Sequence, residues 1–318
     1  MKPKNTHRAC NWSEYNKNLV SRGSIKVWIS PEAASSWKHK GKRSPGGIKK
    51  YSDLAIKVCL IVKEVYKLSL RQCEGFIRSL SELLSIDEVP HYTTICRRMS
   101  ELDFNLLSQL PNKKGLHILI DSTGLKIYGE GEWIRKKHGA SPYSLWTKLH
   151  VAVDHTTQKI ISVKRSDAHG YDSKYFEPLL TGLGLDIACI YGDGAYDKRI
   201  CYQAAHRLNA QLIAPVQRNA RKQKANRDHP YDESLDERDR QIDFINAFED
   251  KDLARALWKK VSQYHKRSLV ETAMYRLKQN FGHRINSRRK DHQQKQMEAR
   301  AFALNKMTDL GIPSQAGS

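Results

Sequence analysis

Three acidic residues of the chain stand where carboxylates could act together on metal ions. Asp121 directly follows the apolar run Leu116–Ile120, and Asp193 stands just beyond a second apolar run, Ile187–Tyr191. Glu271 lies further along the chain, in a stretch with helical periodicity. Carboxylate oxygens are hard ligands that suit Mg²⁺ or Mn²⁺ better than zinc. The three residues are therefore candidate ligands for divalent metal ions.

The two aspartates are more informative as a pair than singly. Carboxylates that follow neighbouring buried strands project into one crevice at the edge of a sheet. Gly192 and Gly194, on either side of Asp193, would let a bulky backbone such as that of nucleic acid approach closely. Alone, either aspartate would more often be a helix cap or a turn residue. Together, after two apolar strands, they indicate metal ligands.

Glu271 shares one face of a predicted helix with three other candidate residues. Arg267 lies four residues before it, Tyr264 seven before it and Lys278 seven after it, and 3.6 residues make one helical turn. An acid framed by two cations and a tyrosine suits metal ligation beside phosphates. The alternative is an amphipathic surface helix whose Arg267–Glu271 ion pair contributes only about 0.3–0.5 kcal/mol. The two upstream aspartates favour the metal site.

The charge of the chain points to a polyanionic partner. Lys and Arg number 55 against 34 Asp and Glu, which gives a net charge of +21. Each phosphate that a basic protein neutralises releases counterions and so strengthens binding. The sequence has no apolar run of membrane-spanning length and no secretory signal, so we expect a cytoplasmic protein without a membrane partner. The six cysteines lack metal-ligand spacing, which favours free core thiols over zinc sites or disulfides.

The N-terminal third is the most basic part, with 19 Lys and Arg against 8 Asp and Glu in its first hundred residues. Residues 1–50 are predicted to form an irregular basic arm. Helical periodicity over 51–112 predicts three short helices, the last carrying Arg97 and Arg98. A helix-turn-helix unit would place that last helix in a major groove of DNA. Spacing alone is more often that of an ordinary helical bundle with a charged face, and the local charge favours DNA binding.

Residues 113–310 predict an α/β catalytic domain. Three consecutive strands precede alternating strands and helices, which indicates a mixed sheet flanked by helices. The expected strands are 116–120, 145–153, 159–163, 187–191 and 211–216, with helices at about 171–183, 198–208 and from about 253 past 278. A basic patch followed by an acidic one predicts a solvated insertion or loop at about 217–250 that could touch DNA.

Three sequence motifs resemble those of a known protein family. They are Asp-Ser-Thr-Gly-Leu-Lys-Ile-Tyr-Gly-Glu-Gly-Glu-Trp at 121–133, Trp-Thr-Lys-Leu-His-Val-Ala-Val-Asp at 146–154 and Gly-Asp-Gly-Ala-Tyr-Asp at 192–197. Together with residues 11–24, they resemble the IS5 family of bacterial insertion-sequence transposases. Tyr264, Arg267, Glu271 and Lys278 match that family's Y-(2)-R-(3)-E-(6)-K pattern. The resemblance covers nearly the whole chain.

The resemblance implies an RNase H-like core, a catalytic triad of Asp121, Asp193 and Glu271, and double-stranded DNA with terminal inverted repeats as substrate. Two Mg²⁺ ions about 3.5–4 Å apart, or Mn²⁺ ions in their place, would activate water or a DNA 3′-OH and stabilise the leaving oxygen. Asp121 would bridge both ions. The family also implies a homodimer on DNA and association with the bacterial nucleoid.

The remaining residues of the cleft would then contact DNA. Arg267 and Lys278 would hold phosphates, and Tyr264 would position the strand. Lys126 and His150 are weaker candidates for the same cleft. A tryptophan could stack on an extruded base, although core packing is commoner for a lone tryptophan; the two candidates are Trp133 and Trp258.

Two other functions fit part of the sequence. A DNA-binding regulator whose acidic residues are structural would share the basic N-terminal part, but three suitably placed carboxylates and Lys278 favour an enzyme. A nuclease on the same core would cut DNA without joining it, and only the family resemblance separates it from a transposase. A DNA end incubated with Mg²⁺ distinguishes these functions by its products.

Overall fold

The computed structural model describes residues 12–41, 49–127, 146–224 and 230–311. The chain folds into two compact units. Unit 1 takes the residues up to Phe104 together with those from Ala299 onward, and unit 2 is Asn105–Glu298. The last helix, α13 (Lys290–Asp309), begins in unit 2 and ends in unit 1.

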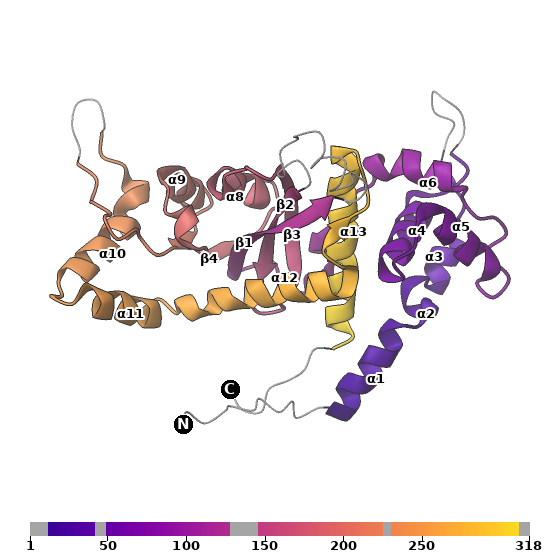
Figure 1. Ribbon diagram of the computed structural model, residues 1–318, viewed down its shortest axis with the longest axis horizontal. Helices are drawn as coiled ribbons and strands as arrows, with labels where there is room; N and C mark the ends of the chain where they lie inside the picture. The colour runs from indigo at the N-terminus through magenta and orange to yellow at the C-terminus, as the bar shows by residue number, and fades with distance from the viewer. Residues whose placement is uncertain (1–11, 42–48, 128–145, 225–229, 312–318) are drawn as a thin grey trace, which may run out of the picture. The chain divides into compact units, whose positions relative to one another are not determined.

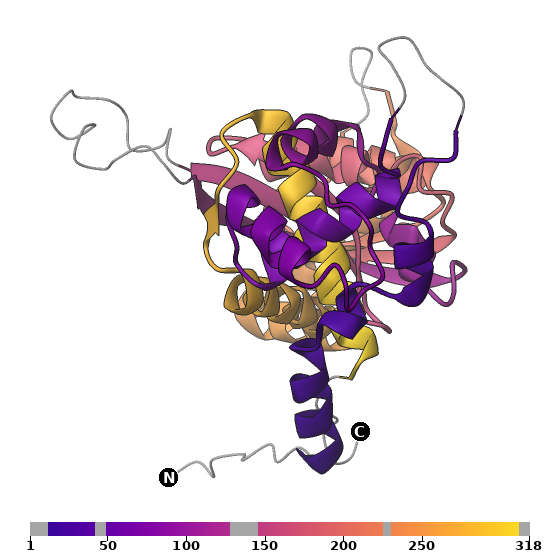
Figure 2. The same cartoon turned by 90° about the vertical axis from the view of Figure 1, so that its right-hand side faces the viewer.

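Unit 1 is built from short helices around an apolar core, drawn in indigo to purple in Figure 2. Serines begin three of these helices: Ser30, Ser52 and Ser69 each accept a hydrogen bond from the backbone N–H three residues on. Such caps satisfy donors that the first helical turn leaves unpaired. The helices are α1 (Trp12–Arg22), α2 (Ile25–Trp28), α3 (Pro31–Ser35), α4 (Asp53–Val65), α5 (Leu70–Ser79), α6 (Tyr92–Arg98) and the 3₁₀ turn η1 (Met99–Glu101).

The prediction of an irregular arm before residue 51 is wrong for the described part of that stretch. It holds α1, α2 and α3, and the side chains of Trp28 and Trp37 are only 3% exposed. The Trp37 indole N–H donates to the Glu88 carbonyl at 2.8 Å, which ties this stretch to the chain after α5. The Gly, Pro and Lys residues that suggested an arm lie mostly after Trp37. The two tryptophans, rather than the overall composition, decide the local structure.

The three helices predicted after residue 51 are confirmed as α4, α5 and α6. The second is shorter than predicted, because α5 ends at Ser79 and the following turns lead to Ser85 in a left-handed conformation with φ 53°. A capping box between Ser69 and Gln72 starts α5.

Unit 2 is a mixed sheet between layers of helices, which confirms the predicted fold class. The path through the sheet is β3-β2-β1-β4-β5, with β6 pairing beside β1. β2 is antiparallel to both of its neighbours, β1 and β3, whereas β4 runs parallel to both β1 and β5. This is the strand order of an RNase H-like core. The strands are β1 (Leu116–Ile127), β2 (Trp146–Asp154), β3 (Ile160–Asp167), β4 (Ile187–Tyr191), β5 (Gln211–Ile213) and β6 (Arg284–Ile285).

Helices cover both faces of this sheet. α8 and α9 lie on one face and α12 on the other (Figure 1). Side chains alternate along a strand, so Ile118 and Ile120 of β1 point into the core with α8 and α9. The Asp121 side chain lies on the opposite face of β1, toward α12. The helices and turns are η2 (Leu106–Gln109), α8 (Asp172–Leu180), η4 (Gly194–Tyr196), α9 (Arg199–Arg207), η5 (Glu233–Leu235), α10 (Asp236–Asn246), α11 (Lys251–Val261), η6 (Tyr264–Arg267) and α12 (Ser268–Phe281).

The solvated insertion or loop expected over 217–250 is partly helical instead. α10 occupies most of its second half, and Ile242 and Ile245 of α10 pack with Val216 and Ala254 in a small core of their own. Charged residues outnumber these few apolar residues in the stretch, so the helix and its small core could not be recognised from the sequence pattern.

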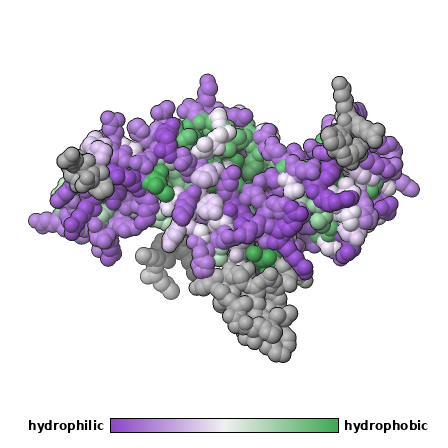
Figure 3. Space-filling view, turned by 90° about the horizontal axis from the view of Figure 1, so that it is seen from above, coloured by the Kyte–Doolittle hydropathy of each residue, from purple (hydrophilic) through white to green (hydrophobic). Residues whose placement is uncertain are grey.

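The surface agrees with a protein that carries many charges. Figure 3 shows one face on which hydrophilic side chains dominate and hydrophobic ones form limited patches. Within the described ranges, every helix is too short or too polar to cross a membrane.

Candidate active site

Asp121 and Asp193 are brought together by the pairing of β1 with β4. Leu119 of β1 is in register with Tyr191, the last residue of β4. Each aspartate stands two positions further along its own chain, where β4 has ended. The negative charge of Asp193 acts on Asp121 and contributes to raising the pKa of its carboxyl group. The two carboxylates are therefore close enough for their charges to interact, as the prediction of a shared site requires.

One detail of the prediction is wrong, because β1 does not end at Ile120. It continues to Ile127, since β2 pairs with it residue by residue as far as Lys126. Asp121 is thus a mid-strand residue opposite Val151. The strand that ends beside Asp121 is β4.

The local structure around Asp193 explains one of its glycines. The Asp193 carboxylate accepts a hydrogen bond from the Ala195 backbone N–H at 2.9 Å and so caps η4. A Cβ atom on Gly192 would lie 2.8 Å from the ring of Tyr196, which is buried. Internal packing, rather than access for nucleic acid, requires glycine at this position. A Cβ on Gly194 would meet its nearest neighbour at an ordinary 3.5 Å.

The predicted helix that carries Glu271 is broken in the structure. Gln263 adopts a left-handed conformation with φ 54°, Tyr264 and Arg267 lie in the 3₁₀ turn η6, and α12 begins only at Ser268. Two residues of the pattern, Arg267 and Lys278, still contact β1. The break turns η6 toward the ends of the strands.

Arg267 links two of the three acids. Its Nη1 donates to Asp121 Oδ2 at 2.8 Å, and its Nη2 donates to Glu271 Oε1 at 2.5 Å. The ion pair with Glu271 is the one that the amphipathic-helix alternative predicts, but the same guanidinium also holds Asp121 from another element. This cation therefore links Glu271 of α12 to Asp121 of β1.

The three acids carry oxygen ligands of the kind that a hard divalent cation prefers. Asp121 is only 16% exposed, and burial raises the pKa of its carboxyl group, although the Ser122 N–H and Arg267 act in the opposite direction. A half-buried carboxylate beside a second carboxylate is stabilised by added positive charge. Among the residues that the structure describes, no three His, Cys, Asp or Glu side chains are close enough together to hold a metal ion. In this arrangement the Arg267 guanidinium stands between Asp121 and Glu271.

Lys278 and Tyr264 complete the face opposite β1. Lys278 Nζ donates to Thr123 Oγ1 at 2.5 Å, and burial lowers the pKa of this lysine. Burial also raises the pKa of Tyr264, and the charges of Asp193 and Asp121 contribute to that increase. Thr123 was not predicted as a site residue. Strand alternation would have indicated it, because it lies two residues after Asp121 on the same face of β1.

The weaker candidates lie in different places. Trp258 is not isolated in a core, because its ring centroid is 5.8 Å from that of Tyr264. Lys126 lies over the ring of Trp146 at 5.4 Å, five residues beyond Asp121 on β1. Trp133 lies outside the described residues.

His150 is structural rather than part of the cleft. It is fully buried, stacks on Tyr175 with centroids 4.3 Å apart, and its Nε2 lies 2.8 Å from Ser166 Oγ. Burial lowers the pKa of His150 to about 4. The imidazole is therefore neutral at physiological pH and packed away from Asp121.

The two arginines of α6 have opposite environments. Arg97 is exposed and lines a pocket of about 680 Å³ between α5 and α6, together with Arg71 and Tyr92. Arg98 is buried at 9% exposure, donates to the Tyr51 carbonyl and pairs with Asp53. The DNA contact expected of Arg98 does not fit this placement. Its guanidinium joins the start of α4 to the end of α6.

A sequence model of the family described as "Transposase DDE domain" matches residues 112–306, more than half of the chain. The chain belongs to the DDE transposases. A second model with the same description matches residues 20–130 of this transposase. It is therefore an enzyme that cleaves DNA and transfers strands, and enzymes with this domain depend on divalent metal ions.

Among solved structures, the transposase is similar to the cryo-EM structure of the piggyBac transposase synaptic complex with hairpin DNA. The two chains share 13% identity at a TM-score of 0.43, over 91% of this chain and 73% of that chain.

Proposed function

We propose that this DDE transposase is a member of the IS5 family that binds the terminal inverted repeats of an insertion sequence. Asp121, Asp193 and Glu271 would hold two Mg²⁺ ions, or Mn²⁺ in their place, and would be the catalytic triad. The ions would supply an activated water or 3′-OH and stabilisation of the leaving oxygen in phosphoryl transfer. A homodimer would hold double-stranded DNA ends during the reaction.

The observation that carries this proposal is the double contact of Arg267. One guanidinium binds both Asp121 and Glu271, and the charge of Asp193 acts on Asp121, so these contacts connect the three acids that the sequence pattern singled out. The amphipathic-helix alternative requires only the pair within η6 and α12. It gives no reason for the contact with β1.

The other residues have roles that follow from their contacts. Arg267 is held close to the reacting atoms, where it can bind a phosphate once its carboxylate partners are neutralised by added cations. Lys278 is kept near β1 by Thr123 and can bind a second phosphate. Tyr264, which packs against Trp258, can position the strand. Arg97 would contribute to DNA binding by unit 1.

The test is incubation of the full chain with a duplex that ends in the inverted repeat, with Mg²⁺ or Mn²⁺. We expect cleaved and strand-transfer products from the wild type and none from Asp193→Asn or Glu271→Gln. The matched control is Glu249→Gln, an exposed acid of unit 2, which should retain wild-type activity. Tight binding of the end without any cleavage by the wild type would favour a DNA-binding regulator, and cleavage without transfer would favour a nuclease. Activity in Asp193→Asn would exclude the proposed triad.

A further inference from the structure

The segment between α12 and the first turn of α13, residues 282–290, is strongly basic. It contains four Arg and Lys and no Asp or Glu. All four basic side chains are exposed, and they are Arg284, Arg288, Arg289 and Lys290. We call these four residues the basic strip.

The backbone that carries the basic strip is held in one conformation by buried glutamines of α13. Gln296 Oε1 accepts from the backbone N–H groups of Asn286 and Ser287, each at 3.1 Å. Gln293 Nε2 donates to the carbonyls of Ser287 and Arg288 at 3.1 and 3.2 Å. Both glutamines are only 2% exposed. Their side chains therefore satisfy backbone groups that an exposed segment would otherwise present to water.

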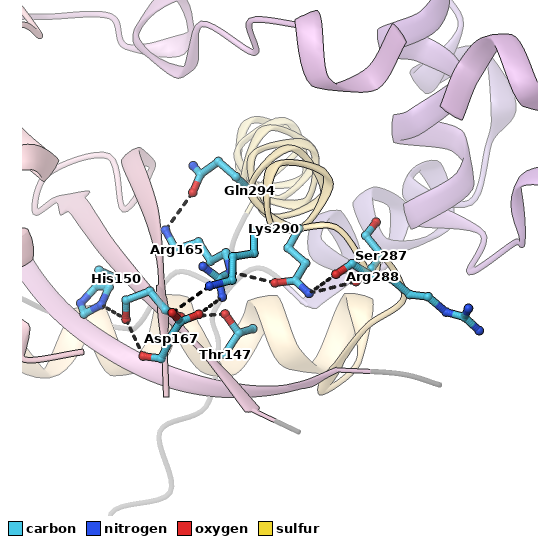
Figure 4. A network of polar contacts seen from close by, with 10 residues as sticks. Thr147, His150, Arg165, Asp167, Ser287, Arg288, Lys290 and Gln294 are labelled. Atoms are coloured by element: carbon cyan, nitrogen blue, oxygen red, sulfur yellow. Dashed lines mark hydrogen bonds and ion pairs between the residues drawn. The ribbon is translucent and has the colours of Figure 1, made fainter. Parts of the chain in front are cut away.

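A second layer of contacts holds Gln293 and the adjacent Gln294. Arg165 of β3 donates from Nε to Gln293 Oε1 at 2.7 Å, and its backbone N–H donates to Gln294 Oε1 at 2.8 Å. Asp167, at the end of β3, pairs with Lys290 at 3.0 Å and with Arg165. Figure 4 shows this network between β3 and α13, with the Arg288 side chain extending away from it. Residues of β3 thus support the segment through α13.

The positive charge of the basic strip is only partly balanced. Asp167 pairs with Lys290, and Asp291 with Arg289. Arg284 and Arg288 have no acidic partner within the described ranges of the chain. A backbone held by side-chain hydrogen bonds, presenting two guanidinium groups that pair with no acid among the described residues, is pre-organised for anions, because little conformational freedom is lost on binding.

The sheet also sets the distance of the basic strip from the catalytic aspartate. β6 pairs in parallel with β1, and Arg284 is in register with Lys126. Lys126 stands five residues beyond Asp121, which is roughly 16 Å along a strand. That distance is about five base pairs of duplex at 3.4 Å per step. A duplex whose scissile phosphate lies at Asp121 is long enough to reach Arg284.

We propose that the basic strip binds the phosphate backbone of the DNA duplex beside the cleavage site, with Arg284 and Arg288 as the two phosphate ligands. This inference rests on the proposed function, because it needs DNA at the carboxylates. It adds a second anchoring surface, within unit 2, that orients the duplex on the catalytic face. The glutamines act as positioning residues for the two arginines.

The test compares the Arg284→Ala/Arg288→Ala double variant with a control of equal charge change, Lys174→Ala/Arg207→Ala. The control residues are exposed and lie on α8 and α9. Affinity for a duplex carrying the element end is measured between 50 and 200 mM salt without divalent ions, using the full chain. Each lost phosphate contact reduces the slope of log K against log salt by about 0.9. We expect the slope of log K against log salt to be smaller in the arginine variant than in the wild type by about 1.8. The affinity lost by the variant relative to the wild type should therefore shrink about tenfold between 50 and 200 mM salt.

The outcomes separate the two proposals. A slope and affinity in the arginine variant equal to those of the lysine–arginine control would overturn the role of the basic strip, while normal cleavage by the wild type would leave the proposed function intact. If the wild type neither binds nor cleaves element ends, both proposals fail together. Because the substituted side chains are exposed, equal melting temperatures serve as the check that both variants are folded.

Discussion

Arg267 donates a hydrogen bond to Asp121 at 2.8 Å across the gap between η6 and β1, while its other terminal nitrogen binds Glu271. One guanidinium thus neutralises part of the charge of two proposed metal ligands. A divalent cation bound by these oxygens must compete with the guanidinium for them. The contact therefore ties the metal affinity of the site to the position of a single arginine.

We expect Arg267→Ala to bind Mn²⁺ severalfold more tightly than the wild type in the absence of DNA, because its carboxylates lack their competing cation. DNA cleavage by the same variant should fall by about 100-fold, as for the loss of a charge-stabilising donor. Isothermal titration calorimetry gives the affinity and a cleavage assay the rate. Lys278→Ala is the control, since Lys278 contacts Thr123 and neither of these carboxylates. Weaker Mn²⁺ binding in Arg267→Ala would contradict this account.

The two glycines beside Asp193 should respond differently to alanine. In Gly192→Ala the new Cβ would lie 2.8 Å from the Tyr196 ring, and such overpacking costs about 1–3 kcal/mol. We expect a lower melting temperature and reduced cleavage, because Asp193 is displaced. Gly194→Ala should keep the wild-type melting temperature, since its nearest neighbour would be 3.5 Å away. If Gly194→Ala is folded but cannot bind DNA ends, nucleic acid approaches the backbone at that glycine.

Arg97 and Arg98, which are adjacent on α6, provide a matched pair of alanine variants. Arg97→Ala should weaken DNA binding without changing the melting temperature, because Arg97 is exposed beside the pocket of α5 and α6. Arg98→Ala should instead destabilise the protein by about 1–3 kcal/mol, because it removes a buried side chain and leaves the Tyr51 carbonyl without its donor. Filter binding and thermal unfolding, measured on both variants, check the two expectations. Equal losses of DNA affinity at unchanged stability would show that Arg98 also contacts DNA.

The buried carboxylate Glu64 should make the stability of unit 1 depend on pH. Burial by itself would raise its pKa, but Lys63 and Arg300 outweigh that effect and lower the pKa from 4.5 to about 2. A lowered folded-state pKa contributes stability that is complete above the unfolded value. It is lost as the pH falls from about 4.5 toward 2.

Urea unfolding of the wild type and Glu64→Gln at several pH values measures this contribution. The variant leaves Arg300 buried without its charged partner, so we expect a loss of about 3–5 kcal/mol at pH 7. Its stability should vary less with pH below 4.5 than that of the wild type. Parallel pH profiles for the two proteins would refute the assignment.

Much of unit 2 could be predicted because its signals are local. Apolar runs placed the strands of the sheet, and a four-residue spacing placed Arg267 beside Glu271. The extension of β1 past Asp121 could not be seen, because it depends on pairing with β2, a partner distant in sequence. The break at Gln263 was likewise hidden, since a continuous helix would satisfy the same spacing.

Burial of charged side chains was the main feature that the sequence did not reveal. Arg97 and Arg98 are chemically identical neighbours, and only the packing of α6 on α4 makes one a surface residue and the other a structural one. The helices before Trp37 and the small core of Ile242 and Ile245 were missed for a similar reason. A few buried side chains decide the structure there, and the more numerous charged residues dominate the composition.

The order in which the ribosome makes this chain has a consequence for unit 1. Glu64 needs Arg300 as its partner, and the two are separated by 236 positions in the sequence. At about 5–20 residues per second, roughly 10–50 s of translation separate them. During that interval the nascent helix α4 exposes a charged pair that becomes buried only when the second half of α13 emerges. A transposase truncated before residue 300 would therefore have an incomplete N-terminal unit, although every codon of residues 1–104 had been read.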